Sequence, residues 1–538
     1  MTLSIDRRQL VATGMFGLAA LAIPGIAAAQ ALFAATGFTH NVASGEPGAH
    51  SVLLWTRYVP AHGGEARVRV ELSETGDFTK IAGGGELVTG PWRDHCVKIT
   101  VAGLKPGTRY HYRFIAGDGA ISPVGRTRTL PLSARRLKLA VFSCSNIGFG
   151  WFNAYAHAAA SDCDFAVHLG DYFYEHAPGQ YPVKAEMVAG RDMLPTHEIL
   201  SLTDYRLRYA SYRADPDLQA LHAAMPMIAI QDDHESANNS WEGGAQNHQA
   251  NEGEWWVRRA AAIQAWREWM PVGDQPWASY DIGGLMSLHR TDTRLLARSQ
   301  GPELTGEMRG DPALLKAFVD GAWRDPARTM MGSEQEAWLA SAMAASSRAG
   351  RRWQVVAFGT NMGFQKTPEA ALDFVPSVPD WAQAGFRNRV ALGRAGLPQE
   401  LDNWGGYPAA RSRFLASAQG LAADTIVISG DSHNAWAYEL AEGGRAAAVE
   451  FGVTSVTSGG LESATRGVSP EVVARTIVAG NPELRWADTS GRGYMQLTLT
   501  PQSAVNDWLF WNSVAVRKPV PDRQTRAQAP RGRRRILI

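Results

Sequence analysis

Cysteine is scarce in this chain, and long apolar runs and net charge are nearly absent as well. Only three cysteines occur in 538 residues, so at most one disulfide can form, and a fold held together by disulfides is excluded. The sequence leaves open whether Cys96 and Cys163 pair. Beyond the N-terminal segment no apolar run reaches the length of about 20 residues that a membrane-spanning helix needs, so we predict no transmembrane span.

The charges balance overall but are distributed unevenly along the chain. Lys and Arg number 53 against 52 Asp and Glu, a net charge of +1, yet residues 517–538 hold eight basic residues and one acidic residue. The long middle part is therefore acidic, which argues against a nucleic-acid-binding surface and suits a protein that binds cations. We predict that the basic tail is a disordered end. Folding over the active site or contact with an anionic cell surface are the alternatives.

The first 30 residues have the composition of a targeting segment. Arg7 and Arg8 precede an apolar stretch at residues 11–23, and three alanines at residues 27–29 form a small-residue cleavage signal. The paired arginines resemble a twin-arginine signal, with an ordinary secretory signal as the alternative. We therefore predict the bacterial twin-arginine export machinery as a partner and a periplasmic or secreted location.

Two different patterns of apolar residues follow along the chain, and they predict two domains. Residues 31–132 contain short alternating strands broken by Gly and Pro, which indicate a β-sandwich similar to a fibronectin type III domain. Residues 133–516 contain short continuous apolar runs separated by helical stretches, which are typical of strands covered on both faces. The predicted fold is a layered α/β domain flanked by helices and preceded by an all-β domain.

Four of the apolar runs end in residues that can bind metals. They are followed by Cys144; by Asp171 and Tyr174; by Asp232, Asp233 and His234; and by Asp431 and His433. Functional groups gather at the carboxyl ends of strands in open α/β sheets, and so many close anions need cations. Thiolate, imidazole and phenolate favour a transition metal such as Fe³⁺, whereas carboxylate and amide oxygens suit Ca²⁺, Mg²⁺ or Mn²⁺. A site with mixed metals is therefore predicted.

The motifs resemble those of PhoD-type alkaline phosphatases, which belong to the metallophosphoesterase class. The resemblance runs from about residue 38 to residue 510. It rests on Asn-Val-Ala-Ser-Gly-Glu-Pro at 41–47, Ser-Cys-Ser-Asn at 143–146, His-Leu-Gly-Asp-Tyr-Phe-Tyr-Glu at 168–175, Asp-Asp-His-Glu at 232–235 with Asn238 and Asn239, Asp-Thr-Arg at 292–294, Trp-Gly-Gly-Tyr-Pro at 404–408 and Ser-Gly-Asp-Ser-His at 429–433. It implies a metallophosphoesterase-like β-sandwich and an enzyme that uses Fe³⁺ with Ca²⁺.

Roles for individual residues follow from the resemblance. It implies that Fe³⁺ is held by Cys144, Asp171, Tyr174, Asp431 and His433, with Asp171 bridging to Ca²⁺. Asp233 becomes a further metal ligand, Asn238 a Ca²⁺ or phosphate contact, and His234 a catalytic residue that contacts the phosphoryl group. Asp232 is expected to hold its neighbours in place. Arg294 either binds phosphate or forms a structural ion pair.

The function implied is hydrolysis of phosphate mono- and diesters by metal-activated hydroxide. Two alternatives remain open from the sequence. The chain could be a phospholipase D-like phosphodiesterase that cleaves phospholipids, or an exported binding protein without catalytic activity.

Overall fold

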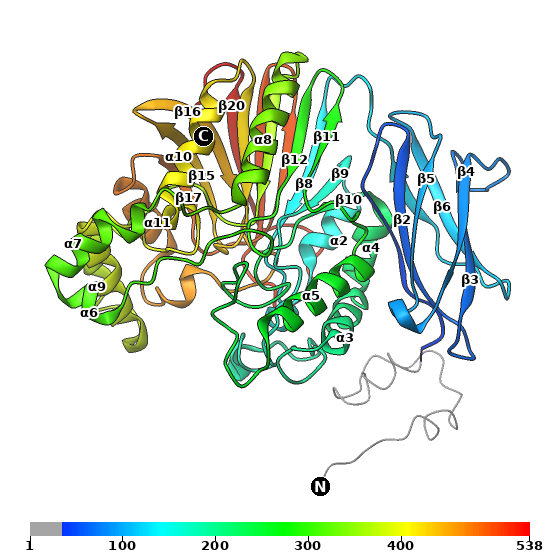
Figure 1. The fold of residues 1–538 in the computed structure, drawn as a ribbon, viewed down its shortest axis with the longest axis horizontal. Coiled ribbons are helices and arrows are strands. Elements are labelled where there is room, and N and C mark those ends of the chain that lie inside the picture. Colours follow the sequence, from blue (N-terminus) through cyan, green and yellow to red (C-terminus); the bar gives the residue numbers. More distant parts are fainter. Residues whose placement is uncertain (1–34) are drawn as a thin grey trace, which may run out of the picture.

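The computed structural model describes residues 35–538 (Figure 1). The predicted signal peptide at residues 1–30 lies outside the described residues. Among the helices of residues 35–538, none is long and apolar enough to cross a membrane.

The N-terminal part is a sandwich of two antiparallel sheets. One sheet has the order β4 (Gly83–Thr89), β3 (Ala66–Ser73), β6 (Arg109–Ala116), β7 (Gly125–Arg128), and facing it lie β1 (Gly37–Gly45), β2 (Ser51–Val59) and β5 (Cys96–Ala102). Every second residue of β3 points inward, so Val68, Val70 and Leu72 pack against Leu54 and Val97 of the facing sheet. This alternation confirms the predicted all-β fold of the N-terminal part.

Two larger sheets form the second part of the molecule. The first continues from β1 through β10 (Met227–Ala229), β9 (Phe165–His168), β8 (Leu137–Phe142), β18 (Arg492–Leu499), β19 (Ser503–Trp511) and β20 (Arg523–Pro530). The second has the order β11 (Ala278–Ile282), β12 (Met286–Arg290), β13 (Trp353–Phe358), β14 (Asp424–Ser429), β16 (Arg445–Gly452), β15 (Ala435–Glu442), β17 (Leu484–Asp488). The two sheets share one hydrophobic core.

Helices cover the outer face of each large sheet. On the first sheet lie α2 (Asn153–Ala159), α3 (Leu202–Arg213), α4 (Pro216–Ala224) and α5 (Trp255–Trp269), and on the second α8 (Gly332–Arg348), α10 (Pro408–Gln419) and α11 (Pro470–Ala479). Strand β13 is apolar on both sides because Val355 faces the other sheet and Val356 faces the helices. The predicted layered α/β fold is confirmed.

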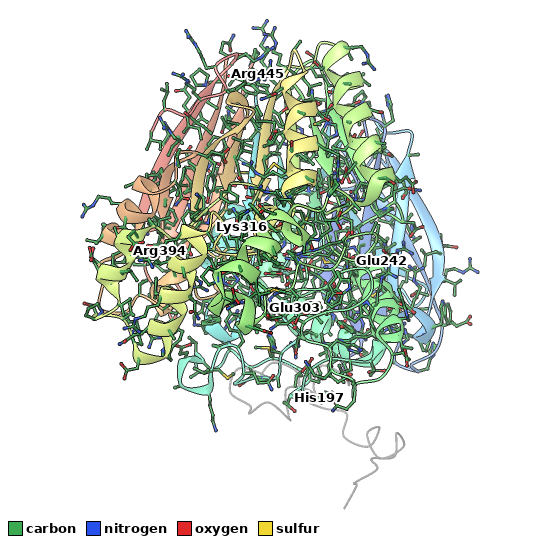
Figure 2. The ribbon with its side chains drawn as sticks, turned by 60° about the vertical axis from the view of Figure 1, so that its left-hand side comes forward. His197, Glu242, Glu303, Lys316, Arg394 and Arg445 are labelled. Atoms are coloured by element: carbon green, nitrogen blue, oxygen red, sulfur yellow. The ribbon has the colours of Figure 1, made fainter. Side chains whose placement is uncertain are left out.

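Three further helices, α6 (Gly306–Gly310), α7 (Pro312–Asp320) and α9 (Asp380–Arg394), project from one end of the second sheet (Figure 1). Figure 2 labels Lys316 on α7 and Arg394 at the end of α9, and the two helices lie side by side. Phe318, Trp323 and Leu392 form a small separate core between them. These helices therefore form a lobe with its own packing.

The prediction of a disordered C-terminal tail is wrong. Within residues 517–538, strand β20 pairs antiparallel with β19 and buries Ala527 and Ala529, while Arg526 on the outer face pairs with Asp507 at 2.7 Å. Residues 523–530 thus form a polar edge strand. Arg526 lies on its solvent side, whereas Arg523 lies on the same side as Ala527 and Ala529, where it is half-buried against the Phe510 ring and pairs with Asp488.

The tail does not fold over the predicted site either. Arg531 and Arg534 lie 3.2 and 3.7 Å from Asp424, which begins β14. The predicted metal-binding residues follow the opposite end of that strand, so residues 531–534 of the tail and the site occupy opposite ends of the sheet.

All three cysteines lie in the described part of the chain, are buried and are free of disulfides. Cys96 and Cys163 both lie in the core beneath α2–α5. Their burial protects the thiols from oxidation.

A buried histidine near the junction of the two parts makes stability depend on pH. The Nε2 atom of His40 donates to the Ala210 carbonyl at 3.1 Å, and burial, with the charges of Arg57 and Arg213, holds the pKa of His40 well below its usual value. The unfolded chain therefore binds a proton at His40 at a pH at which the folded chain leaves His40 neutral. Stability is lost as pH falls below about 6.5, at about 1.4 kcal/mol per pH unit for this group.

We therefore expect His40→Gln, which keeps a donor for the carbonyl, to reduce the fall in melting temperature between pH 7.5 and pH 5. Thermal unfolding at the two pH values measures the effect. The matched control is His62→Gln at an exposed position, which should behave as the wild type. An unchanged pH dependence in the His40 variant would contradict this assignment.

Candidate metal centre

Four strand ends bring the predicted residues together. Strands β8, β9 and β10 run parallel in the first sheet, with Phe142 and Ala229 both opposite His168 in register, and β14 ends at the same edge of the second sheet. The loop after each strand carries part of the site. Because strand ends are held by the ladders on both sides, the loops start from rigid positions.

The backbone is left-handed at four of the predicted metal ligands. Cys144, Asp171, Asp431 and His433 have φ values of 60°, 53°, 65° and 61°. Such conformations cost of order 1–3 kcal/mol for residues with a Cβ atom and persist only where the surroundings enforce them. They turn each side chain back across the strand ends. Gly170 helps, since a Cβ atom there would lie 2.4 Å from the Cβ atom of Asp232.

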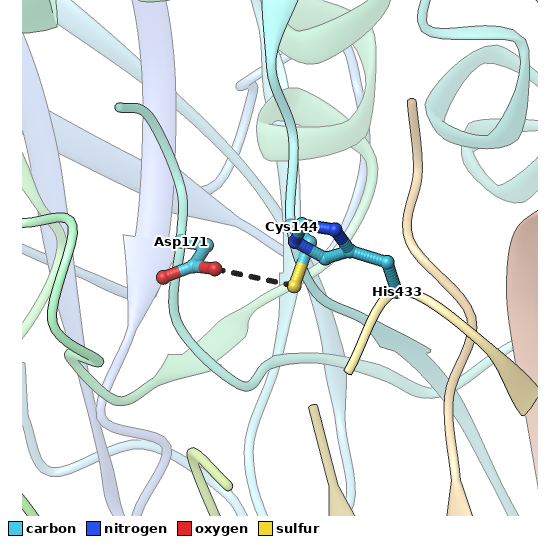
Figure 3. A group of neighbouring side chains, drawn as sticks. All are labelled: Cys144, Asp171 and His433. Carbon is cyan, nitrogen blue, oxygen red and sulfur yellow. Dashed lines mark hydrogen bonds between the residues drawn. The ribbon is translucent and has the colours of Figure 1, made fainter. Parts of the chain in front are cut away.

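The first group of ligand atoms combines sulfur, nitrogen and oxygen. One potential ligand atom from each of Cys144, Asp171 and His433 lies within 4.8 Å of the others (Figure 3). The Cys144 thiol is 3.3 Å from Asp171 Oδ2. The Tyr174 hydroxyl lies 3.2 Å from the same oxygen and 2.9 Å from His433 Nε2, so a phenol joins the group.

The second group consists of carboxylates. Oxygen atoms of Asp171, Asp232, Asp233 and Asp431 lie within 4.8 Å of one another, and Asp171 belongs to both groups. Except for the half-buried Asp431, all of these residues are buried. Such a cluster repels itself strongly unless positive charge is supplied.

Arg294 supplies part of that charge. Its side chain has no exposed surface, and its Nε and Nη2 atoms donate to the two oxygens of Asp232 at 2.7 and 3.0 Å. It also pairs with Asp402 and lies 3.8 Å from Asp233 and 3.9 Å from Asp431. This enclosed geometry favours the structural ion pair over phosphate binding. Asp402, which the sequence analysis missed, is separated from Arg294 by more than 100 residues and had no motif to reveal it.

One guanidinium does not neutralise the cluster. Burial, with the charges of Asp233 and Asp232, raises the pKa of Asp171 well above its usual value, and burial and Asp232 do the same for the pKa of Asp431. Burial and Asp171 raise the pKa of the Cys144 thiol. Within residues 35–538, the buried Oδ1 atom of Asp171 has no hydrogen-bond partner. An orphaned oxygen among crowded acids, beside a thiol, a phenol and an imidazole, fits bound cations.

A buried acid–histidine pair lies beside the cluster. His234 Nδ1 is 2.6 Å from Glu175 Oε2, and although Glu175 is buried, the His234 charge lowers the pKa of that carboxyl to about 2. The other oxygen, Oε1, accepts from the Asn238 backbone at 2.7 Å and from Asn247 Nδ2 at 2.8 Å. Glu175 thus fixes the orientation of His234. The sequence analysis missed it, although it directly follows Tyr174.

The neighbouring residues Asn238 and Asn239 make different contacts. The Asn238 side chain donates to Gln246 Oε1, so its role as a Ca²⁺ or phosphate contact remains a prediction. Asn239 has a left-handed backbone with φ of 51°, donates its backbone N–H to Asp233 at 2.7 Å and lines the same groove as Asp431. Asn239 is therefore a second amide at the cluster that the sequence analysis did not select.

Comparison with known protein families supplies the identity. Residues 139–508 match the PhoD-like phosphatase family, and residues 25–131 match the N-terminal domain of PhoD-like phosphatases. The chain belongs to the PhoD-like phosphatase family. It is accordingly a phosphoric ester hydrolase, and the resemblance inferred from the motifs is confirmed.

Individual relatives agree with this family. Alkaline phosphatase D of Bacillus subtilis (strain 168) is 31% identical over 541 residues, covering 94% of this chain and 84% of the relative. A solved structure of PhoD superposes with a TM-score of 0.75 at 27% identity, covering 94% of this chain and 92% of the other. A purple acid phosphatase from yellow lupin (Lupinus luteus) shares the fold, with a TM-score of 0.53 at 13% identity over 90% of this chain and 73% of the other.

Arg294 provides a test of the charge balance in this PhoD-like centre. Arg294→Met keeps much of the side-chain length but leaves Asp232 and Asp402 without their partner. We expect the free energy of unfolding of the metal-loaded protein to fall by about 3–5 kcal/mol, because a buried charge loses its counter-ion. Chemical denaturation measures the change.

The matched control is Arg394→Met, which removes an arginine whose pair with Glu369 is largely exposed. It should cause no measurable loss of stability. Equal stability of the two variants would show that Arg294 does not balance the carboxylates.

Proposed function

We propose that this chain is an exported hydrolase of phosphate mono- and diesters that acts at the strand-end cluster with Fe³⁺ and Ca²⁺ bound. The single observation that carries the proposal is the meeting of the two ligand groups at Asp171, one with a thiol and an imidazole and the other with carboxylates only. The first suits a transition metal and the second suits a hard cation. Residues 31–132 and 133–516 then form the N-terminal and the catalytic domain, with β20 completing the catalytic sheet.

The proposed ligands divide accordingly. Cys144, Tyr174 and His433 would hold Fe³⁺ together with Asp171 and Asp431. Asp233 and Asn238 would help to hold Ca²⁺, and Asp171, which belongs to both ligand groups, would contribute to both cations. Asp232 remains paired with Arg294 and orients its neighbours. Cations held there would offset the charge of the phosphoryl group and would lower the pKa of a water molecule for the attack on phosphorus.

His234 has the geometry of a proton donor to the leaving group. Because Glu175 holds Nδ1 at 2.6 Å, the Nε2 atom is the ring nitrogen left for the substrate. The Glu175 carboxylate stabilises the charged imidazolium, and its own orientation is fixed by Asn238 and Asn247. The pair can therefore protonate the departing oxygen as the ester bond breaks.

Export remains part of the proposal. Arg7 and Arg8 support the twin-arginine route, by which a protein crosses the membrane folded and can acquire its metal before export. If the protein with both arginines replaced by lysine still leaves the cytoplasm, this route is excluded.

Hydrolysis of aryl phosphate mono- and diesters by the purified, metal-loaded protein tests the function. We expect turnover that chelation removes and that Fe³⁺ with Ca²⁺ restores. If the protein cleaves phospholipids but not the aryl esters, the phospholipase D-like alternative holds. If metal analysis finds stoichiometric metal and no ester is cleaved, the protein is a binding protein.

Tyr174 allows the iron ligand to be observed directly. A phenolate on Fe³⁺ gives a visible charge-transfer band, so we expect Tyr174→Phe to abolish the colour of the protein. The absorption spectrum, normalised to measured iron, records this. Tyr209→Phe is the control, since the buried Tyr209 hydroxyl has no hydrogen-bond partner among the described residues and its loss should leave the band unchanged. A colourless wild-type protein with stoichiometric iron would refute the Tyr174 assignment.

Glu175 can be tested through the leaving group. Glu175→Gln keeps the side-chain shape but removes the charge that supports the imidazolium, so proton donation should weaken. We expect kcat for alkyl esters, whose leaving group needs the proton, to fall about 100-fold, and kcat for p-nitrophenyl esters to fall only severalfold. The same loss for both leaving groups would show that Glu175 is merely structural.

A further inference from the structure

An apolar groove opens beside the metal centre on the His433 side. It encloses about 480 Å³, and its wall includes Phe149, Tyr181, Val183 and Trp381. The Tyr181 hydroxyl lies 3.2 Å from His433 Nδ1, and the Phe149 ring meets the Tyr181 ring edge-on at 5.1 Å between centroids. The aromatic wall is therefore continuous with a residue of the metal centre.

A second groove on the Asp431 side has the opposite character. It encloses about 240 Å³ and is lined mainly by amides and acids, among them Asn239, Asn361, Asp402 and Asn434. The two grooves share Arg389, Ser432 and Leu461. A phosphate ester at the centre therefore has apolar surface on one side and polar surface on the other.

The apolar groove suits a planar ring. Trp381 is 71% exposed and Val183 is 51% exposed, and both line the same groove with Phe149 and Tyr181. A contiguous apolar surface of this kind marks a site for a ligand or partner. Rings of Phe, Tyr and Trp favour another aromatic group over an alkyl chain because they gain stacking energy in addition to area burial. Arg389, which lines both grooves, has a charge complementary to that of an anionic ester, and in the structure it pairs with Glu400 at 3.4 Å. The volume matches a small-molecule site.

We propose that this groove binds a planar aromatic group of the substrate, with Phe149 and Trp381 as specificity-determining residues. The preferred substrates are then phosphate diesters that have one aromatic arm toward His433 and one polar arm toward Asp431. The inference rests on the proposed function, because it places the phosphate at the metal centre.

Stable phosphonates test the groove without turnover. Calorimetry on the metal-loaded protein compares phenylphosphonate with methylphosphonate, with cyclohexylphosphonate of similar bulk, and with hexylphosphonate as an alkyl chain. We expect phenylphosphonate to bind about fivefold to tenfold more tightly than each of the other three. If methylphosphonate binds as tightly as phenylphosphonate, the groove takes no part in binding. If the cyclohexyl or hexyl compound binds as tightly as the phenyl compound, the groove is apolar but not selective for rings.

Substitutions in the groove test which residues produce the preference for phenylphosphonate. Trp381→Ala and Phe149→Ala should each reduce the preference for phenylphosphonate to about twofold or less and leave the affinity for methylphosphonate unchanged, and Trp381→Phe should retain most of the preference. Trp256→Ala, at an exposed tryptophan on α5, is the matched control and should change nothing. A full preference in both alanine variants would overturn the proposal.

The two proposals fail in different ways. If inorganic phosphate and all four phosphonates fail to bind the metal-loaded protein, the proposed function is wrong. The groove proposal, which rests on that function, is then wrong as well. If they bind with equal affinity, the metal centre still holds phosphate and only the groove proposal is overturned.

Discussion

Repulsion among buried carboxylates is the constraint on which the centre of this protein depends. Four aspartates hold their oxygens within 4.8 Å of one another, and Arg294 offers one positive charge to Asp232, Asp402 and their neighbours. In a low-dielectric interior such an arrangement is costly unless further cations neutralise it. The Oδ1 atom of Asp171, a residue that belongs to both ligand groups, is buried and has no hydrogen-bond partner among the described residues, so a bound cation would satisfy it.

The layered fold is what makes this arrangement possible. Strands β8, β9, β10 and β14 are apolar on both faces and are held by ladders and helices, so their ends are rigid. Left-handed backbone at Cys144, Asp171, Asp431 and His433 then turns the ligands inward at an energetic cost that the surrounding core sustains. The stability of the core therefore sustains the backbone strain at the site.

The surroundings of the centre differ from side to side. Glu175 orients His234 on one flank, amides and acids line the groove beside Asp431, and aromatic side chains line the groove beside His433. The strand-end cluster is the proposed site of the chemistry, whereas the flanks are formed by loops and by the lobe of α6, α7 and α9. Because Trp381 belongs to that lobe, differences in substrate preference can arise there without changing the centre.

The sequence alone determined the layered fold and the residue types that gather at the strand ends, because apolar runs covered on both faces and the polar residues directly after them are local patterns. It failed for residues 523–530, whose weak alternation of small and basic residues becomes a strand only when β19 offers a partner. It also missed Asp402, Glu175 and Asn239. Tertiary structure decided these roles, since the contact of Arg294 with Asp402 and that of Tyr181 with His433 join residues 108 and 252 positions apart. Charge balance and groove shape depend on such distant neighbours, and no local pattern encodes them.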